Sequence, residues 1–176
     1  MKGTTELGIY YKKGETTNIV AYTGSDFAGD IDDRKSISGF VFFLGSGAVS
    51  WSSKKQPVVT LSTIQAEYIA VATCACQCIW IKRIMETLGF NENHTLILCD
   101  NNSAIQLSKN PVFHGRSKHI DVQFHFLRDM VKDGSIELKH YSSQSQVTDI
   151  MTKPLKLEQF LNLRSKMGLI EASIVN

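Results

Sequence analysis

Residues 18–30, NIVAYTGSDFAGD, join a short apolar run to an acidic end. The run IVAY at residues 19–22 is rich in strand-favouring side chains, and it stops where the small and polar residues TGSD begin. Residues 95–100, TLILCD, repeat this arrangement of a hydrophobic strand that ends in an aspartate. Open α/β sheets bind ligands and metals at the ends of their strands. The two stretches therefore predict a shared polar site at one end of a sheet.

The spacing of apolar residues predicts the other elements of one mixed α/β domain. Strand-like patterns come first, and from Ser62 or Thr63 the pattern is helical as far as Leu88, where Gly89 ends it. Hairpins between consecutive strands require an antiparallel half of the sheet, and helical crossovers require a parallel half. The predicted strands are 9–11 (at an edge), 19–22, 38–44, 48–53, 95–99 and 136–141, and the predicted helices are 62–88, 101–107, 119–132, 144–153 and 155–168.

Length and composition describe an ordinary globular protein. The chain has 176 residues, enough for one domain with a core, and 43% of them are hydrophobic and 20% charged. No apolar run approaches the length needed to span a bilayer, and the first residues lack the apolar core of a secretory signal. A net charge of +2 neither favours nor excludes nucleic acid. Basic residues nevertheless gather in predicted loops, at 34–35, 54–55 and 116–119.

The four cysteines are Cys74, Cys76, Cys78 and Cys99. The first three lie in a helical pattern with no second pair of ligands at the spacing of a zinc site, and residues two apart on a helix point in different directions. We therefore expect small buried residues in a reducing compartment rather than a metal centre.

Four acids stand at the ends of predicted elements: Asp26, Glu67, Asp100 and Asp149. Each has a structural explanation when taken alone, because the helix dipole favours acids near helix N-termini and an aspartate after a strand often caps the next helix. Together they would repel one another unless a cation neutralised them. Two magnesium ions held roughly 4 Å apart can cleave a phosphodiester, so the cluster indicates this class of chemistry.

Five longer stretches make the interpretation specific, because each resembles the ribonuclease H domain of copia-type long-terminal-repeat retrotransposon Pol polyproteins. The resemblance extends from about Lys2 to Lys166, with the motifs in the order of the family. The stretches are 32–56 (DDRKSISGFVFFLGSGAVSWSSKKQ), 61–70 (LSTIQAEYIA), 98–105 (LCDNNSAI), 110–131 (NPVFHGRSKHIDVQFHFLRDMV) and 146–155 (QVTDIMTKPL).

The resemblance implies a ribonuclease H-like α/β fold with a five-stranded mixed sheet, three antiparallel strands followed by parallel strands, flanked by helices. It divides the chain into a remnant of the preceding connection (1–17), the ribonuclease H-like domain (18–154) and a C-terminal helical tail (155–176). The expected setting is a monomer without membrane contact, separated from its ancestral partner, the reverse transcriptase domain. The localisation is intracellular, with cytoplasm and nucleus both open.

The family holds two Mg²⁺ ions, for which Mn²⁺ can substitute, with four carboxylates in the order Asp, Glu, Asp, Asp. Glu67 matches the second acid, Asp100 the third and Asp149 the fourth. Related integrases and transposases place their glutamate last, so the early Glu67 argues against those classes.

This sequence departs from the family pattern at the position of the first acid. The family pattern resembles Tyr-Ser-Asp-Ala-Asp-Trp-Ala-Gly, and its earlier aspartate is the metal ligand. Aligned through residues 27–29, that position is Gly24, and Asp26 matches the second, non-catalytic acid. On a continuing strand Asp26 would face the same side, displaced by about 7 Å. We expect the catalytic site to be impaired, with Asp26 as a weak substitute.

The family substrate is an RNA–DNA hybrid, which is gripped through phosphates and RNA 2′-hydroxyls. Three polar residues at a helix N-terminus could contact the RNA backbone: Asn101, Asn102 and Ser103. Arg116, Lys118 and His119 match a family motif and are expected at phosphates. For Arg34, Lys54 and Lys55, plain solvation is an equal alternative to phosphate contact.

Two other functions remain open at this stage. One is a catalytically dead relic that acts at most as a nucleic-acid-binding module, and it predicts hybrid binding without metal. The other is a stable fold used only as a protein-interaction surface, which predicts binding of neither metal nor hybrid.

Overall fold

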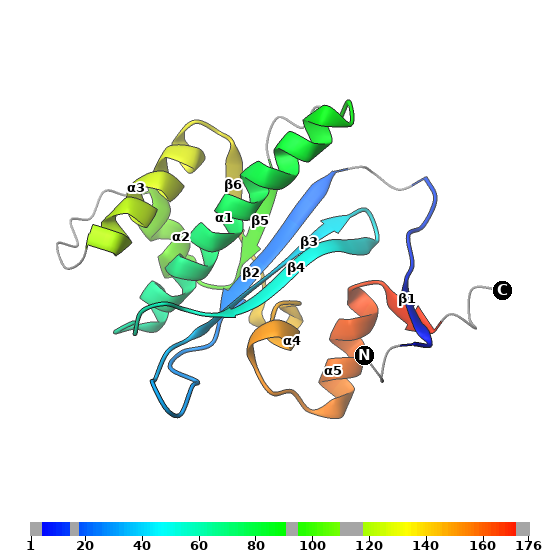
Figure 1. The fold of residues 1–176 in the computed structure, drawn as a ribbon, viewed down its shortest axis with the longest axis horizontal. Coiled ribbons are helices and arrows are strands. Elements are labelled where there is room, and N and C mark those ends of the chain that lie inside the picture. Colours follow the sequence, from blue (N-terminus) through cyan, green and yellow to red (C-terminus); the bar gives the residue numbers. More distant parts are fainter. Residues whose placement is uncertain (1–4, 15–17, 91–94, 110–117, 172–176) are drawn as a thin grey trace.

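The structure is a computed structural model that describes residues 5–14, 18–90, 95–109 and 118–171, with only the backbone for residues 118–121 and 124. It contains a five-stranded sheet with the strand order β4-β3-β2-β5-β6 (Figure 1). Strands β2 (Ile19–Ser25), β3 (Ile37–Leu44) and β4 (Gly47–Lys55) are antiparallel. Strands β5 (Thr95–Cys99) and β6 (Ile136–His140) continue the sheet in parallel to β2. The predicted mixed sheet is confirmed.

Helices cover both faces of this sheet (Figure 1). Helix α1 (Thr63–Thr87) packs on β2, β3 and β5, together with α2 (Asn102–Lys109) and α3 (Lys118–Lys132). The short helix α4 (Asp149–Thr152) lies on the other face, against β2, β3 and β4, next to α5 (Leu157–Lys166). The sheet is therefore the middle layer of the domain.

Apolar side chains alternate along the strands between the two faces of the sheet, and each face has its own core. On β3, Phe40 and Phe42 join the larger core under α1, whereas Val41 and Phe43 join a smaller core with Val147 on the α4 side. Strands bury both faces only when side chains alternate between two apolar layers. This explains why residues 38–44 read as a nearly continuous apolar run.

Helix α1 begins and ends close to its predicted limits. Ser62 is the N-cap, and its side chain accepts a hydrogen bond from the Gln65 backbone N–H at 3.2 Å. With 25 residues, α1 is long and apolar enough to cross a membrane by length and composition. The expectation that no apolar run approaches that length is thus wrong, but 61% of the apolar stretch is buried inside the domain, as in a core helix.

The segment before the last acid differs from the single helix predicted over 144–153. It forms a 3₁₀ turn, η1 (Ser143–Ser145), and then the four-residue helix α4. Between them, Gln146 has an extended backbone, and its Nε2 atom donates a hydrogen bond to the carbonyl oxygen of Thr23 at 3.1 Å. This tertiary bond holds the segment on β2, so local helical periodicity does not decide its conformation.

The two ends of the chain meet in a second, two-stranded sheet. The edge strand predicted over 9–11 lies two residues earlier, as β1 (Leu7–Ile9). It pairs antiparallel with β7 (Leu169–Glu171), a strand that the sequence pattern did not predict (Figure 1). Just before β7, Met167 is buried in the smaller core beside Val41. The division at residues 17/18 and 154/155 stays a prediction.

The predicted burial of the cysteines holds for Cys74, Cys78 and Cys99, whereas Cys76 is exposed on α1. None of these four cysteines forms a disulfide bond.

Candidate metal site

Glu67 is the most deeply placed of the predicted acids. It lies in the second turn of α1 and is only 8% exposed. Its Oε1 atom accepts a hydrogen bond from the Ser25 backbone N–H at 2.9 Å, and its Oε2 atom lies 3.9 Å from the Cys99 thiol sulfur. Glu67 therefore connects α1 with the ends of β2 and β5.

Asp100 completes a compact group of donors with Glu67 and Cys99. One ligand atom from each of the three residues lies within 4.8 Å of the others. Burial, and then the charge of Asp100, raise the pKa of Glu67 to about 8. Two carboxylates this close favour a cation between them, and oxygen donors suit a hard divalent ion. The two carboxylates thus fit the metal that the resemblance implies, whereas burial raises the pKa of the Cys99 thiol, which disfavours it as a ligand.

Asp149 is the first residue of α4 and lies outside the set of mutually close ligand atoms. Its Oδ1 atom accepts a hydrogen bond from the Lys153 ammonium at 2.7 Å. Burial lowers the pKa of Lys153, but the hydrogen bond and charge of Asp149, with the charges of Asp100 and Glu67, outweigh it and leave the pKa raised. Lys153 is therefore a fixed positive charge beside the three acids.

Gly24 occupies the strand position at which the family pattern places the first acid. It pairs in register with Gly39 across β2 and β3. A Cβ atom built on Gly24 would lie 2.7 Å from Oγ1 of Thr148, the residue before Asp149. A side chain at position 24 would thus point toward the start of α4.

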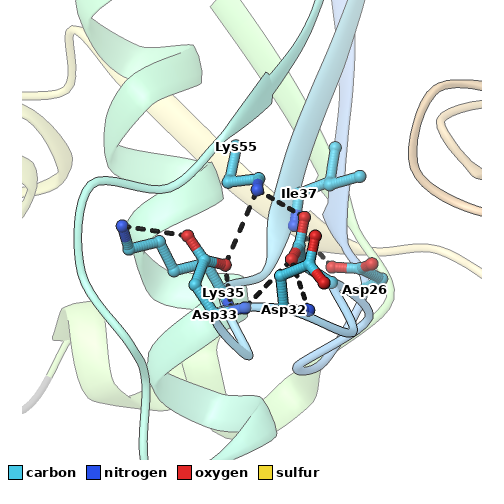
Figure 2. A network of polar contacts seen from close by, with 7 residues as sticks. Asp26, Asp32, Asp33, Lys35, Ile37 and Lys55 are labelled. Atoms are coloured by element: carbon cyan, nitrogen blue, oxygen red, sulfur yellow. Dashed lines mark hydrogen bonds and ion pairs between the residues drawn. The ribbon is translucent and has the colours of Figure 1, made fainter.

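Asp26 forms its hydrogen bond within the loop between β2 and β3 (Figure 2). Its Oδ1 atom accepts a short hydrogen bond from the Ile37 backbone N–H. It is not part of the compact group of Glu67, Cys99 and Asp100. In this structure the carboxylate closes the loop rather than joining those donors, and metal binding by Asp26 stays a prediction.

Acids of the same loop form ion pairs with Lys55, one of the predicted basic residues. Lys55 pairs with Asp30 and, at 3.6 Å, with Asp33 (Figure 2). The hydrogen bond from Lys55 is the main cause of the lowered pKa of Asp30. Arg34 and Lys54 are exposed, so phosphate contact by these two remains open.

The polar residues after β5 lie where they were predicted. Asn101 accepts a hydrogen bond from the Ala104 backbone N–H at 3.0 Å, so it caps the first turn of α2. Asn102 and Ser103 are exposed beside it. Arg116 and the side chains of Lys118 and His119 lie outside the described residues.

Sequence reasoning missed three residues around this site. Cys99 lies in the donor group, and Thr148 lies against Gly24. Lys153 had a readable signal, because it stands four residues after Asp149, the spacing of a helical ion pair. No local pattern indicated Thr148, since its contact is with a distant strand.

Comparison with known proteins gives strong relatives at the sequence level. No protein-family profile matches the chain. It is 42% identical over 172 residues to the retrovirus-related Pol polyprotein from transposon RE2 of Arabidopsis thaliana, and 41% identical over 169 residues to that from transposon TNT 1-94 of Nicotiana tabacum. The chain is a homologue of transposon Pol polyproteins. The match covers 97% and 96% of this chain but only 12% and 13% of those relatives, so it corresponds to one segment of a Pol polyprotein.

Solved structures show which fold this Pol segment has. The chain resembles LC11-RNase H1 in complex with an RNA/DNA hybrid, with a TM-score of 0.54 and 12% identity over 77% of this chain and 94% of that one. It also resembles the N-terminal ribonuclease H domain of a Mycobacterium tuberculosis protein, with a TM-score of 0.56 and 10% identity over 85% of this chain and 98% of that one. The fold is that of ribonuclease H, and the chain belongs to the transposon Pol polyproteins as a segment with this fold.

Proposed function

We propose that this chain derives from a copia-type ribonuclease H that hydrolyses the RNA strand of RNA–DNA hybrids with divalent metal ions, and that its activity is impaired at Gly24. The observation that carries the proposal is the convergence of Glu67 and Asp100 at the ends of β2 and β5, with Gly24 at the strand position of the expected first acid. The fold and the Pol relatives support the same reading.

Mg²⁺, with Mn²⁺ as a substitute, is the proposed cofactor, and it would supply water activation and stabilisation of the leaving oxygen. Glu67 and Asp100 would hold it directly, because their oxygens already lie close together. Asp149 would join them by releasing Lys153, to which its Oδ1 atom is now bonded. Asp26 would join only by giving up its bond to the Ile37 N–H, which agrees with a weak substitute.

The proposed substrate is an RNA–DNA hybrid. The structural relative LC11-RNase H1 was solved with such a hybrid, and so was a foamy viral protease–reverse transcriptase, 19% of whose chain matches this fold. In this chain the exposed Asn102 and Ser103 and the capping Asn101 stand directly after Asp100. We assign contact with the RNA backbone to these three residues, and phosphate contact to Arg116, Lys118 and His119.

The loss of one acidic ligand favours a second candidate function, a nucleic-acid-binding module without catalysis. Lys153 supports this candidate, because its ammonium already neutralises part of the charge that a cation would neutralise. In both cases we propose an intracellular monomer, in the cytoplasm or nucleus.

The test is cleavage of an end-labelled RNA–DNA hybrid with Mg²⁺ or Mn²⁺, beside hybrid binding without metal. The matched control is Glu67→Gln, which keeps the size of the side chain and removes its charge. We expect hybrid binding by both proteins and weak cleavage, or none, by the parent. Efficient cleavage that Glu67→Gln abolishes would contradict the impairment, and loss of both binding and cleavage would leave only an interaction surface.

A further inference from the structure

Two glycines let α4 approach the sheet at the site. Gly24 and Gly39 face one another in register on β2 and β3. A Cβ atom on Gly39 would lie 2.8 Å from Thr152 Cγ2 and 2.9 Å from Met151 Cβ, and one on Gly24 would lie 2.7 Å from Thr148 Oγ1. Real Cβ atoms do not come this close to their neighbours, so glycine at both positions is what allows the contact.

Thr148 is held firmly in this contact. Its side chain is fully buried, and its carbonyl oxygen accepts hydrogen bonds from the Met151 N–H at 2.9 Å and the Thr152 hydroxyl at 3.2 Å. Two residues earlier, Gln146 is anchored to Thr23 of β2. The bonds to the Thr148 carbonyl lie within the segment, whereas the bond from Gln146 crosses to the sheet, so the segment cannot retreat from Gly24 without breaking that bond.

The Thr148 hydroxyl has no hydrogen-bond partner among the residues that the structure describes. A buried hydroxyl without a partner is unfavourable, so hydrogen bonding does not account for threonine at this position. Its Oγ1 atom instead fills the space next to Gly24, where a side chain would begin.

We propose that Thr148 occupies the place of the first carboxylate, so that Gly24 and Thr148 together close this position of the site. This inference rests on the proposed function for the meaning of position 24. It gives Thr148 a steric role, which is to fill the space that a side chain at position 24 would need. The loss of the first acid then involves two residues, Gly24 and Thr148. A new acid at position 24 can enter the site only if the Thr148 Oγ1 atom is removed.

The geometry specifies which variants open the space. Only Oγ1 conflicts with a Cβ at position 24, since the Thr148 Cβ atom would lie 3.8 Å away, an ordinary contact. Thr148→Ala therefore opens the space, while Thr148→Val keeps its shape and removes only the hydroxyl. This pair separates a steric effect from a polar one.

The first test is thermal unfolding without metal, with Gly24→Ala introduced into the parent, Thr148→Val and Thr148→Ala proteins. We expect Gly24→Ala to lower Tm by roughly 3–10 °C in the first two proteins, as overpacking does. In Thr148→Ala we expect little loss. An equal loss in all three backgrounds would overturn the inference.

The second test is calorimetric titration with Mn²⁺ alone. We expect Gly24→Asp to bind no more tightly than the parent, and Gly24→Asp/Thr148→Ala to gain on the order of tenfold in affinity, because a further carboxylate joins the site. The control is Gly24→Asn/Thr148→Ala, which has the same shape without the charge. Equal affinities of the single and double variants would overturn the inference.

Cleavage of the RNA–DNA hybrid then separates the inference from the proposed function. If Gly24→Asp/Thr148→Ala is more stable than Gly24→Asp and binds Mn²⁺ more tightly, the inference holds, whether or not the hybrid is cut. An uncut hybrid would then count against the nuclease function alone. Cleavage by the double variant and not by Gly24→Asp supports both.

Discussion

Lys153 donates a hydrogen bond from its ammonium group to Asp149 Oδ1 at 2.7 Å, one turn further along the chain. The pair connects the start of α4 with its end, and it holds a positive charge beside the acids of the candidate metal site. Asp149 is mostly buried, with 13% of its side chain exposed, whereas 41% of the Lys153 side chain is exposed.

Replacing Lys153 tests whether this charge competes with a metal ion. We expect Lys153→Met to raise the affinity for Mn²⁺ by roughly 2–5-fold, because Asp149 becomes free to bind the cation. This change in affinity corresponds to the free energy of a partly exposed ion pair. Lys153→Arg keeps the charge and is the control. An affinity that falls in Lys153→Met would show that Lys153 supports metal binding.

The raised pKa of Glu67 predicts how the stability of the metal-free protein depends on pH. Its pKa is about 8 in the folded protein, against an ordinary value of 4.5, so the folded state holds the proton more tightly than the unfolded state. The resulting stabilisation is complete below pH 4.5 and is lost as the pH rises to about 8. Urea unfolding across this range should show the decline, and Glu67→Gln should flatten it. A decline of the same size in Glu67→Gln would assign it to other groups.

The same pKa predicts the opposite trend for metal binding. A proton on Glu67 competes with the cation, so affinity for Mn²⁺ should rise with pH until the carboxyl is ionised, near pH 8. Calorimetric titrations from pH 6 to pH 9 measure this. Affinity that is independent of pH over that range would exclude Glu67 as a ligand.

Asp26 can be tested for its two roles separately. Asp26→Ala leaves the half-buried Ile37 N–H without this acceptor, so we expect it to lower the free energy of unfolding by about 1 kcal/mol. Asp26→Asn keeps an acceptor oxygen and should cost less. For Mn²⁺ affinity, we expect Asp26→Asn to lose less than Glu67→Gln. A loss as large as that of Glu67→Gln would make Asp26 a full metal ligand.

The strands of the central sheet were predictable because each is an apolar run between turns, and α1 because its cap and its periodicity agree. Residues 143–152 were not, since the bond from Gln146 to Thr23, a residue far away in sequence, decides their conformation. Strand β7 has only three residues, and its pairing with β1 could not be read from either segment alone.

The site was predictable in its carboxylates but not in what surrounds them. Glu67, Asp100 and Asp149 came from motif order, and the first two do meet. The use of Asp26 as a loop acceptor depends on how the chain turns back to Ile37, which spacing does not determine. The contact of Thr148 with Gly24 depends on the depth at which α4 sits on the sheet.

The pairing of β1 with β7 has a consequence for any attempt to work with a shortened protein. A fragment cut to residues 18–154 would lose both strands, and with them Leu163 and Met167, whose side chains are buried. The smaller core, where Val41 and Phe43 pack, would then face water. Since α4 rests on the same face of the sheet, trimming the ends of the chain would loosen the support of Asp149, although neither end contributes a residue to the site.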